Sequence, residues 1–211
     1  MTKYVSIIGN GESRRGFDLS PLKSFSTVIG CNAIHRDYVT EYLVCADRHM
    51  CQQAVNAVGK GTTIFTRDKW SDQFANWPNV RKLPDLPYSG DKRQDEPFHW
   101  GTGPYAGVLG LTFKPKAIFM LGFDLYSSDK STPNNMYTGS EGYTYIKRAV
   151  DPSYWIYQFH KLMGYSDPST RWIVVNSPDW KMPEEWKKHP NVFQETYEGM
   201  ARFINKQLAK K

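Results

Sequence analysis

Short polar residues follow several buried-looking apolar runs in the sequence, and their types suit the binding of a nucleotide or sugar. Asn32, Asp47 and Asp124 each come just after such a run. Amides and carboxylates hydrogen-bond bases and ribose hydroxyls, and a carboxylate can also accept a proton or bind Mg²⁺. If the apolar runs are parallel strands, their carboxyl ends meet at one edge of a sheet, so we expect these side chains to share one site. Taken alone, Asp47 is better explained as the cap of a following helix.

A glycine-rich loop, IIGNGESRR, follows the first apolar run. Gly9 and Gly11 permit close approach of the backbone to a ligand, and Asn10 offers an amide to a base or a sugar hydroxyl. Ser13, with neighbouring backbone N–H groups, can bind an anion. The dinucleotide pattern fails because Arg14 stands at its third glycine position, and the chain has no GxxxxGK[ST] sequence. Spacing alone leaves two interpretations open, a ligand-binding loop and a plain connection with solvated arginines.

The sequence WGTGPYAGVLGL offers a helix start as a third element of the site. Thr102 and Gly103 lie at the N-terminus of a predicted small-residue helix, where free N–H groups and the helix dipole favour a phosphate or carboxylate. The structural alternative is an N-cap whose small residues pack closely on the sheet. The two uses are compatible.

The elements that must position these groups alternate along the chain between strands and helices. Short runs rich in β-branched residues predict strands at 4–8, 27–31, 41–45, 62–65, 117–121 and 171–175. Helices are predicted at about 47–58, 68–76, 103–113, 153–163 and 196–209. This alternation predicts an α/β, Rossmann-like fold, with a mostly parallel sheet covered by helices on both faces.

The length of 211 residues predicts one nucleotide-binding domain over 1–211. Two segments, 78–101 and 125–150, break the strand and helix pattern. Long loops inside a compact domain are often functional lids. The tyrosines and asparagines of the second segment predict a lid-like insertion at about 125–150 that orders over a ligand.

Charge, hydropathy and cysteine content indicate which partners and which cellular location to expect. The net charge of +6 favours anionic partners, but the basic residues are scattered and no nucleic-acid motif is present, so nucleic acid is a possible partner that is not favoured. No run is long enough for a membrane span and no signal peptide is evident, which predicts a cytoplasmic protein. Cys31, Cys45 and Cys51 are expected to be reduced packing residues, not zinc ligands or a disulfide.

The ordered set IIGNGES, GCNAI, TGPYAGVLGL and IFMLGFDLY resembles the bacterial sialyltransferases that use CMP-sialic acid. Their broader superfamily includes proteins similar to 6-hydroxymethylpterin pyrophosphokinases. The resemblance covers about residues 4 to 126 and weakens beyond. The motifs are moderately specific as a set and poor singly.

The resemblance implies roles for particular residues. Those implied to hold the nucleotide are Asn10, Gly11, Ser13 and Asn32, with Thr102 and Gly103 at its ribose or phosphate and Asp124 beside the donor. Tyr126, and Tyr137 in the predicted lid, would stabilise the charge of the departing phosphate. The family is metal-independent, so the resemblance implies no required cofactor and a nucleotide-sugar donor, CMP-linked by preference. By position alone, Tyr126 could equally be a core aromatic residue.

The sequence departs from the family at two places. Glu12 replaces the loop proline, where it could point away or pair with Arg14 or Arg15. The family's catalytic histidine has no histidine counterpart here, and the alignment reaches 149–153, where Asp151 is the one residue that could accept a proton. Asp151 is therefore the first candidate for the base, with His99 and His35 as competitors. His160, inside a predicted helix, is expected to be a packed histidine.

Three functions remain open at this point. The leading one is a metal-independent glycosyltransferase-like enzyme that transfers a sugar from a nucleotide to an unidentified acceptor hydroxyl. The second is a pyrophosphokinase-like transfer from ATP to a small hydroxymethyl heterocycle, in which Asp47 and Asp124 would bind Mg²⁺. The third is a non-catalytic nucleotide- or nucleic-acid-binding module that lacks a base.

Overall fold

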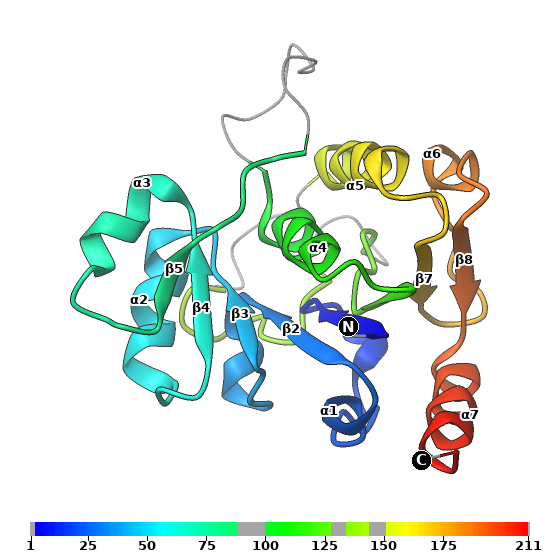
Figure 1. Ribbon diagram of the computed structural model, residues 1–211, viewed down its shortest axis with the longest axis horizontal. Helices are drawn as coiled ribbons and strands as arrows, with labels where there is room; N and C mark the ends of the chain where they lie inside the picture. The colour runs from blue at the N-terminus through cyan, green and yellow to red at the C-terminus, as the bar shows by residue number, and fades with distance from the viewer. Residues whose placement is uncertain (1–2, 88–99, 128–133, 144–150, 211) are drawn as a thin grey trace.

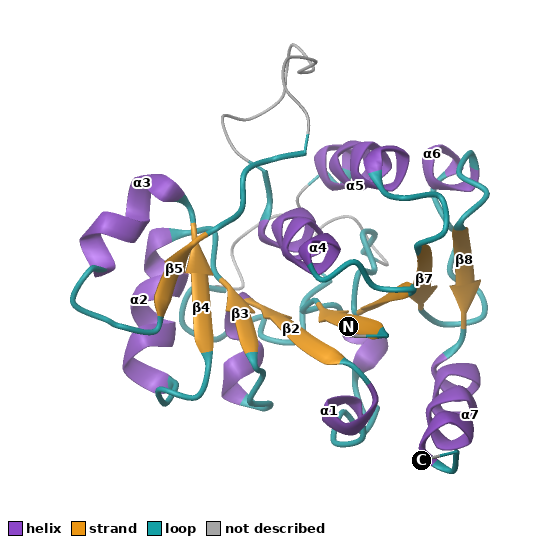
Figure 2. Cartoon of the chain, in the orientation of Figure 1, coloured by secondary structure: helices purple, strands orange, loops and turns teal. Residues whose placement is uncertain are grey.

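The strands pair in a single parallel sheet (Figures 1 and 2). The computed structural model describes residues 3–87, 100–127, 134–143 and 151–210. Within them eight parallel strands run in the order β5-β4-β3-β2-β1-β6-β7-β8. Their bounds are β1 Tyr4–Ile8, β2 Thr27–Cys31, β3 Tyr42–Val44, β4 Thr63–Thr66, β5 Val80–Lys82, β6 Ala117–Leu121, β7 Arg171–Val175 and β8 Val192–Glu195. The parallel sheet confirms the α/β, Rossmann-like fold class that the sequence predicts.

The central strands form because apolar residues can be buried on both faces of a parallel sheet. β1 and β6 are buried almost throughout, and each pairs with the other along its whole length. All six predicted strands are present. The two that were not predicted, β5 and β8, are the edges of the sheet and are mostly exposed, so they lack the apolar run that marks the others.

Helices cover both faces of the sheet (Figure 1), as the sequence predicts. One face carries α1 Leu22–Phe25, α2 Arg48–Ala57 and α7 Tyr197–Leu208, and the other carries α4 Thr102–Thr112, α5 Ser153–Tyr165 and α6 Glu184–Lys187. A further helix, α3 Asp68–Ser71, contacts β5. Short 3-10 turns are η1 Glu12–Arg14, η2 Asn32–Arg36 and η3 Asp72–Phe74. The sequence analysis did not predict α1 and α6, which have only four residues each.

Each face has its own apolar core because side chains alternate along the strands. Ile7 of β1 packs in the core beneath α4, α5 and α6, whereas Ile8 packs in the core beneath α1, α2 and α7. Small residues let α5 lie close to α4: a Cβ on Gly107 would lie 3.0 Å from Leu162. Both helices therefore have fixed positions relative to the sheet edge.

The order of the strands creates a switch point at the centre of the sheet. From β1 the chain moves outward through β2, β3, β4 and β5, and α4 then returns it to β6 on the other side of β1. The chain consequently leaves β1 for α1 on one face of the sheet and leaves β6 for α5 on the other. In open α/β sheets, ligands bind at the carboxyl edge beside such a switch point.

Among the described residues, none of the helices has both the length and the apolar composition needed to cross a membrane.

Candidate functional site

A cavity of about 600 Å³ lies at this carboxyl edge. Its walls come from the loops after β1, β2, β3 and β6, from the start of α4, from α5 and from residues 134–143. The residues singled out in the sequence that line it are Gly9, Asn10, Gly11, Asn32, Asp47, Thr102, Gly103, Asp124 and Asp151. Groups as far apart in the chain as Gly9 and Asp151 thus surround one space, which is large enough for a small-molecule ligand.

Other predicted site residues do not line this cavity. Ser13, Tyr126 and Tyr137 are absent from its walls, and the Tyr126 side chain is exposed on the outside beside Trp180. His35 is also outside it, with Nδ1 2.9 Å from the carbonyl oxygen of Asn32. His99 lies outside the described residues.

The backbone of the β1 loop is engaged by the protein itself. The amides of Gly9 and Gly11 donate to the carbonyls of Leu121 and Gly122 at 2.7 and 2.9 Å, and those of Glu12 and Ser13 donate to side-chain oxygens of Asn134 and Asp124 at 2.8 Å each. The loop therefore continues the pairing of β1 with β6. The amides of Glu12 and Ser13 thus have acceptors within the chain, and the predicted anion-binding role of Ser13 stays a prediction.

The two loop glycines are required by close packing between the loops after β1 and β6. A Cβ on Gly9 would lie 2.4 Å from the carbonyl oxygen of Gly122, and one on Gly11 would lie 2.5 Å from the carboxyl carbon of Asp124. Neither distance is tolerated by real side chains. Gly9 and Gly11 thus allow the loops after β1 and β6 to pack closely, and both residues also line the cavity.

Asp124 is buried and held by three donor groups. Its Oδ2 accepts from the Ser13 amide at 2.8 Å, while its Oδ1 accepts from the Ser13 hydroxyl and from Asn176 Nδ2, the latter at 3.2 Å. The Ser13 hydroxyl also contacts the Tyr197 hydroxyl at 2.9 Å. Burial raises the pKa of Tyr197 to about 12. Ser13 therefore positions Asp124 instead of facing a ligand.

Sequence reasoning missed Asn176 and Tyr197. Asn176 follows β7 and Tyr197 begins α7, and both lie beyond the part of the chain that carries the family resemblance. A short polar residue directly after the predicted strand 171–175 was the available signal for Asn176. Nothing comparable marks Tyr197.

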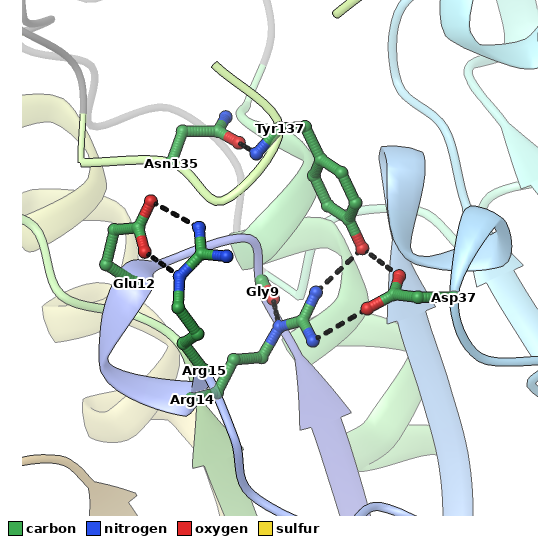
Figure 3. Close-up of polar contacts among 7 residues, drawn as sticks. All are labelled: Gly9, Glu12, Arg14, Arg15, Asp37, Asn135 and Tyr137. Carbon is green, nitrogen blue, oxygen red and sulfur yellow. Dashed lines mark hydrogen bonds and ion pairs between the residues drawn. The ribbon is translucent and has the colours of Figure 1, made fainter.

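Arg14 is buried in a polar cage next to the loop (Figure 3). Its Nε donates to the Gly9 carbonyl at 2.8 Å, and its two terminal nitrogens reach Asp37 at 3.3 Å and the Tyr137 hydroxyl at 2.7 Å. The Tyr137 hydroxyl in turn donates to Asp37. Burial raises the pKa of Tyr137, so the phenol stays neutral. Tyr137 is thereby held by Arg14 and Asp37 and does not line the cavity, and its predicted catalytic role stays a prediction.

Arg15 differs from Arg14 in being exposed, and it pairs with Glu12 at 2.6 Å (Figure 3). Of the two expectations for Glu12, pairing with an arginine is observed. Glu12 is also not among the residues that line the cavity.

Residues 134–143 form one wall of the cavity and contribute Asn134, Asn135, Gly142 and Tyr143. The Tyr143 hydroxyl accepts from Asn10 Nδ2 at 3.0 Å, and burial raises the pKa of Tyr143. Tyr143 and Tyr154 both line the cavity, and the sequence analysis selected neither of them. Tyr143 lies within the predicted lid of about 125–150. The rest of that prediction, at 128–133 and 144–150, falls outside the described residues.

The start of α4 faces the cavity. The Thr102 hydroxyl donates to Asn32 Oδ1 at 3.1 Å and accepts from the Ala46 amide at 3.3 Å, tying the loops after β2 and β3 to this helix. Asn32 itself has a φ of 49°, a left-handed conformation that asparagine tolerates. The amides of Thr102 and Gly103 belong to the first turn, where no acceptor exists within a helix. They suit an anionic group of a ligand.

Two carboxylates lie at the rim. Asp47 precedes α2 but makes no side-chain capping bond, so the capping interpretation is not realised and the carboxylate faces the cavity. Asp151 precedes α5, is exposed, and accepts from the Ser153 amide at 2.9 Å. His49 also lines the cavity and was not predicted. His160 is packed outside the cavity, with Nδ1 2.8 Å from His189 Nε2.

Within the described parts of the chain, His, Cys, Asp and Glu do not gather in any group of three that could hold a metal ion. Cys31, Cys45 and Cys51 are buried and unbonded to one another, and burial raises the pKa of Cys31 to about 12. Their packing role is the one expected.

Comparison with known proteins adds information about the fold. No family model and no curated protein matches the sequence. Among solved structures, the fold is similar to the sialyltransferase CstII from Campylobacter jejuni in complex with a substrate analogue, cytidine-5'-monophosphate, at a TM-score of 0.53 and 16% identity over 84% of this chain and 81% of that one. A CstII structure with trisaccharide acceptor and CMP matches at 0.49 and 16% identity, over 90% and 87% of the two chains. The chain therefore has a sialyltransferase-like fold.

Proposed function

We propose that this chain binds a CMP-linked sugar in the cavity and transfers the sugar to an acceptor hydroxyl without a metal ion. The observation that carries the proposal is the convergence of Asn10, Asn32, Thr102 and Asp124 on one cavity at the switch point of the sheet. The similarity of the fold to a sialyltransferase solved with CMP supports the choice of nucleotide.

In this proposal the nucleoside lies over Gly9 and Gly11, with Asn10 as a hydrogen-bonding partner. The Asn10 Oδ1 is buried and has no hydrogen-bond partner among the residues that the structure describes. A buried acceptor of this kind is costly to leave unpaired. A donor group on a ribose or cytosine would satisfy it.

The phosphate lies near the start of α4, where the Thr102 and Gly103 amides and the positive end of the helix dipole favour negative charge. Tyr143 lines the cavity, and burial raises the pKa of its phenol. We propose that it takes the role that the resemblance gave to Tyr126 and Tyr137: its hydroxyl donates to the departing phosphate, whose charge grows as the bond to the sugar breaks.

Asp151 is the proposed base. Its carboxylate accepts the proton of the acceptor hydroxyl as that oxygen bonds to the sugar carbon, and the bond between the sugar and the CMP oxygen breaks with its electron pair going to the phosphate. Because Asp151 is exposed at the rim, an acceptor can reach it and the proton can pass to water. Asp47 and His49 are the other rim groups that a test of this role must consider.

The Mg²⁺-dependent alternative gains no support from the geometry. It needs Asp124 as a metal ligand, but both carboxylate oxygens of Asp124 already accept hydrogen bonds from Ser13, and one also accepts from Asn176. A metal at Asp124 would have to displace these donors.

The test is a thermal-shift screen of the whole chain with CMP, CDP, UDP, GDP and ATP, each with and without Mg²⁺. A ligand present at 100 times its Kd stabilises the folded state by about 2.7 kcal/mol. We expect CMP to give the largest shift and Mg²⁺ to leave it unchanged. A flat response to all five nucleotides, or an ATP response that requires Mg²⁺, would contradict the proposal.

An Asp151→Asn variant separates binding, measured by the same thermal-shift screen, from catalysis, measured by a transfer assay. We expect the variant to keep the CMP shift and to lose transfer from a CMP-linked sugar, because the amide cannot accept a proton. Asp72→Asn, an exposed position on η3, is the matched control and should keep both.

A further inference from the structure

Gln158 is a buried polar residue that the proposed mechanism does not use. It lies on α5, is 1% exposed and lines the cavity beside Trp155 and Phe159. Its Oε1 accepts from the Gly101 amide at 3.0 Å. Its Nε2 has no hydrogen-bond partner within residues 3–87, 100–127, 134–143 and 151–210. Buried amide donors are rarely left unpaired in folded proteins, so this nitrogen calls for an explanation.

The orientation of the Gln158 amide is fixed by its backbone partner. Gly101 presents an N–H, which can only donate, so the oxygen of the amide must face it and the nitrogen must face away. Rotating the amide by half a turn would set two donors against each other. The unpaired group is therefore a donor whichever way the rest of the cavity is arranged.

The start of α4, which follows the Gly101 partner of Gln158, offers further hydrogen-bond donors. Gly101 immediately precedes α4, whose first-turn amides at Thr102 and Gly103 lack acceptors within the helix. The residue at the next position is Pro104, which has no N–H. Gln158 and the start of this eleven-residue helix thus line the same cavity, and both carry donors that suit an oxygen with negative charge.

We propose that Gln158 is a substrate-binding residue that donates from Nε2 to an anionic oxygen of the ligand at the start of α4. The inference rests on the proposed function and extends it, because it assigns part of the recognition to α5, outside the motifs of the sequence. The oxygen belongs either to the phosphate of the nucleotide or to a carboxylate on the transferred sugar. Both present the same chemistry to an amide donor.

The test is a Gln158→Glu variant of the whole chain. One carboxylate oxygen can still accept from Gly101, while the other replaces the donor with a negative charge. Binding of cytidine, CMP and a CMP-linked sugar that carries a carboxylate is measured by calorimetry. Gln207→Glu makes the same charge change on α7, where the glutamine accepts from Lys3 at 3.4 Å, and serves as the control.

We expect Gln158→Glu to weaken CMP at least about tenfold and cytidine less than about twofold, since hydrogen bonds to charged groups are worth more than neutral ones. Loss confined to the carboxylate-bearing donor would assign the oxygen to the sugar and also support the proposal. Equal affinities of wild type and Gln158→Glu for all three ligands would overturn it while leaving the proposed function intact. If wild type bound none of the three, the proposed function would fail and this inference with it.

A neutral variant covers the case in which Gln158→Glu does not fold. Gln158→Met has a similar length and no charge, and it removes the donor. We expect it to weaken the same ligands as Gln158→Glu, by about threefold to tenfold, with cytidine again little affected. A uniform loss for all three ligands would indicate a structural role and would overturn the proposal.

Discussion

The two ends of the cavity differ in whether their hydrogen-bond donors are paired within the protein. At the β1 loop, the amides of Gly9, Gly11 and Ser13 all donate to the neighbouring β6 loop, and Arg14 is enclosed in a cage. At the end between α4 and α5, the Gln158 Nε2 has no partner among the described residues. The loop that most resembles a ligand-binding motif therefore uses its backbone donors in hydrogen bonds within the protein. One donor that is left for a ligand, the Gln158 Nε2, lies on α5, where the sequence has no motif.

The difference follows from where each end lies. The β1 loop is at the centre of an eight-stranded sheet, where buried backbone groups must be paired and the neighbouring β6 loop is within reach. The first turn of α4 has amides that lack acceptors within the helix, and it begins at the wall of the cavity. Position in the fold, and not residue type, decides which donors stay available.

The largest effect is expected from Gly9→Ala. A methyl group would lie 2.4 Å from the backbone oxygen of Gly122, which cannot rotate away as a side chain can. We expect the free energy of unfolding to fall by about 3 kcal/mol, as in overpacked cores. Chemical denaturation measures it.

Gly61→Ala is the control for this substitution, because a Cβ there would meet no atom within 4 Å. It should not lower stability. If Gly9→Ala were as stable as Gly61→Ala, the view that close packing fixes the β1 loop would be wrong.

A smaller effect is expected from replacing Arg14. Arg14→Leu leaves Asp37, the Tyr137 hydroxyl and the Gly9 carbonyl without their common donor. Asp37 is 41% exposed and can be rehydrated, so we expect a loss of about 2 kcal/mol, less than for a fully buried pair. Arg15→Leu, in an exposed pair, should leave the unfolding curve essentially unchanged. If Arg14→Leu lost no more unfolding free energy than Arg15→Leu, the contacts of Arg14 would add no stability.

The smallest effect is a dependence of stability on pH. The pKa of Tyr197 is about 12 in the folded chain, against about 10 for an unperturbed tyrosine. The folded state therefore holds this proton more tightly, and its contribution is complete below pH 10 and is lost as the pH rises toward 12. Between pH 9 and 11, the stability difference between wild type and Tyr197→Phe should shrink by about 1 kcal/mol.

Comparing the two proteins at each pH removes the contribution of Cys31 and Cys51, whose raised pKa values affect both equally. A difference in unfolding free energy that stayed constant from pH 9 to 11 would mean that the Tyr197 hydroxyl is not buried in the network with Ser13.

The sequence was sufficient for the central architecture. β1 and β6 are continuous apolar runs between turn residues, and such runs predict buried parallel strands directly. It was not sufficient for β5 and β8, because edge strands are stabilised by their neighbours and carry little apolar pattern of their own. The same order of strands and helices also predicted which loops would meet at the switch point.

For the site, the sequence by itself determined which strand ends would converge, because the positions of Asn10, Asn32 and Asp124 follow from the parallel topology. Only the tertiary structure decided which groups face the cavity. Ser13 bonds Asp124 and Tyr137 bonds Arg14, whereas Tyr143 and Gln158 line the cavity. The physical reason is that a buried hydrogen-bonding group must find a partner, and those partners lie up to 184 residues away along the chain, as the contact of Ser13 with Tyr197 demonstrates.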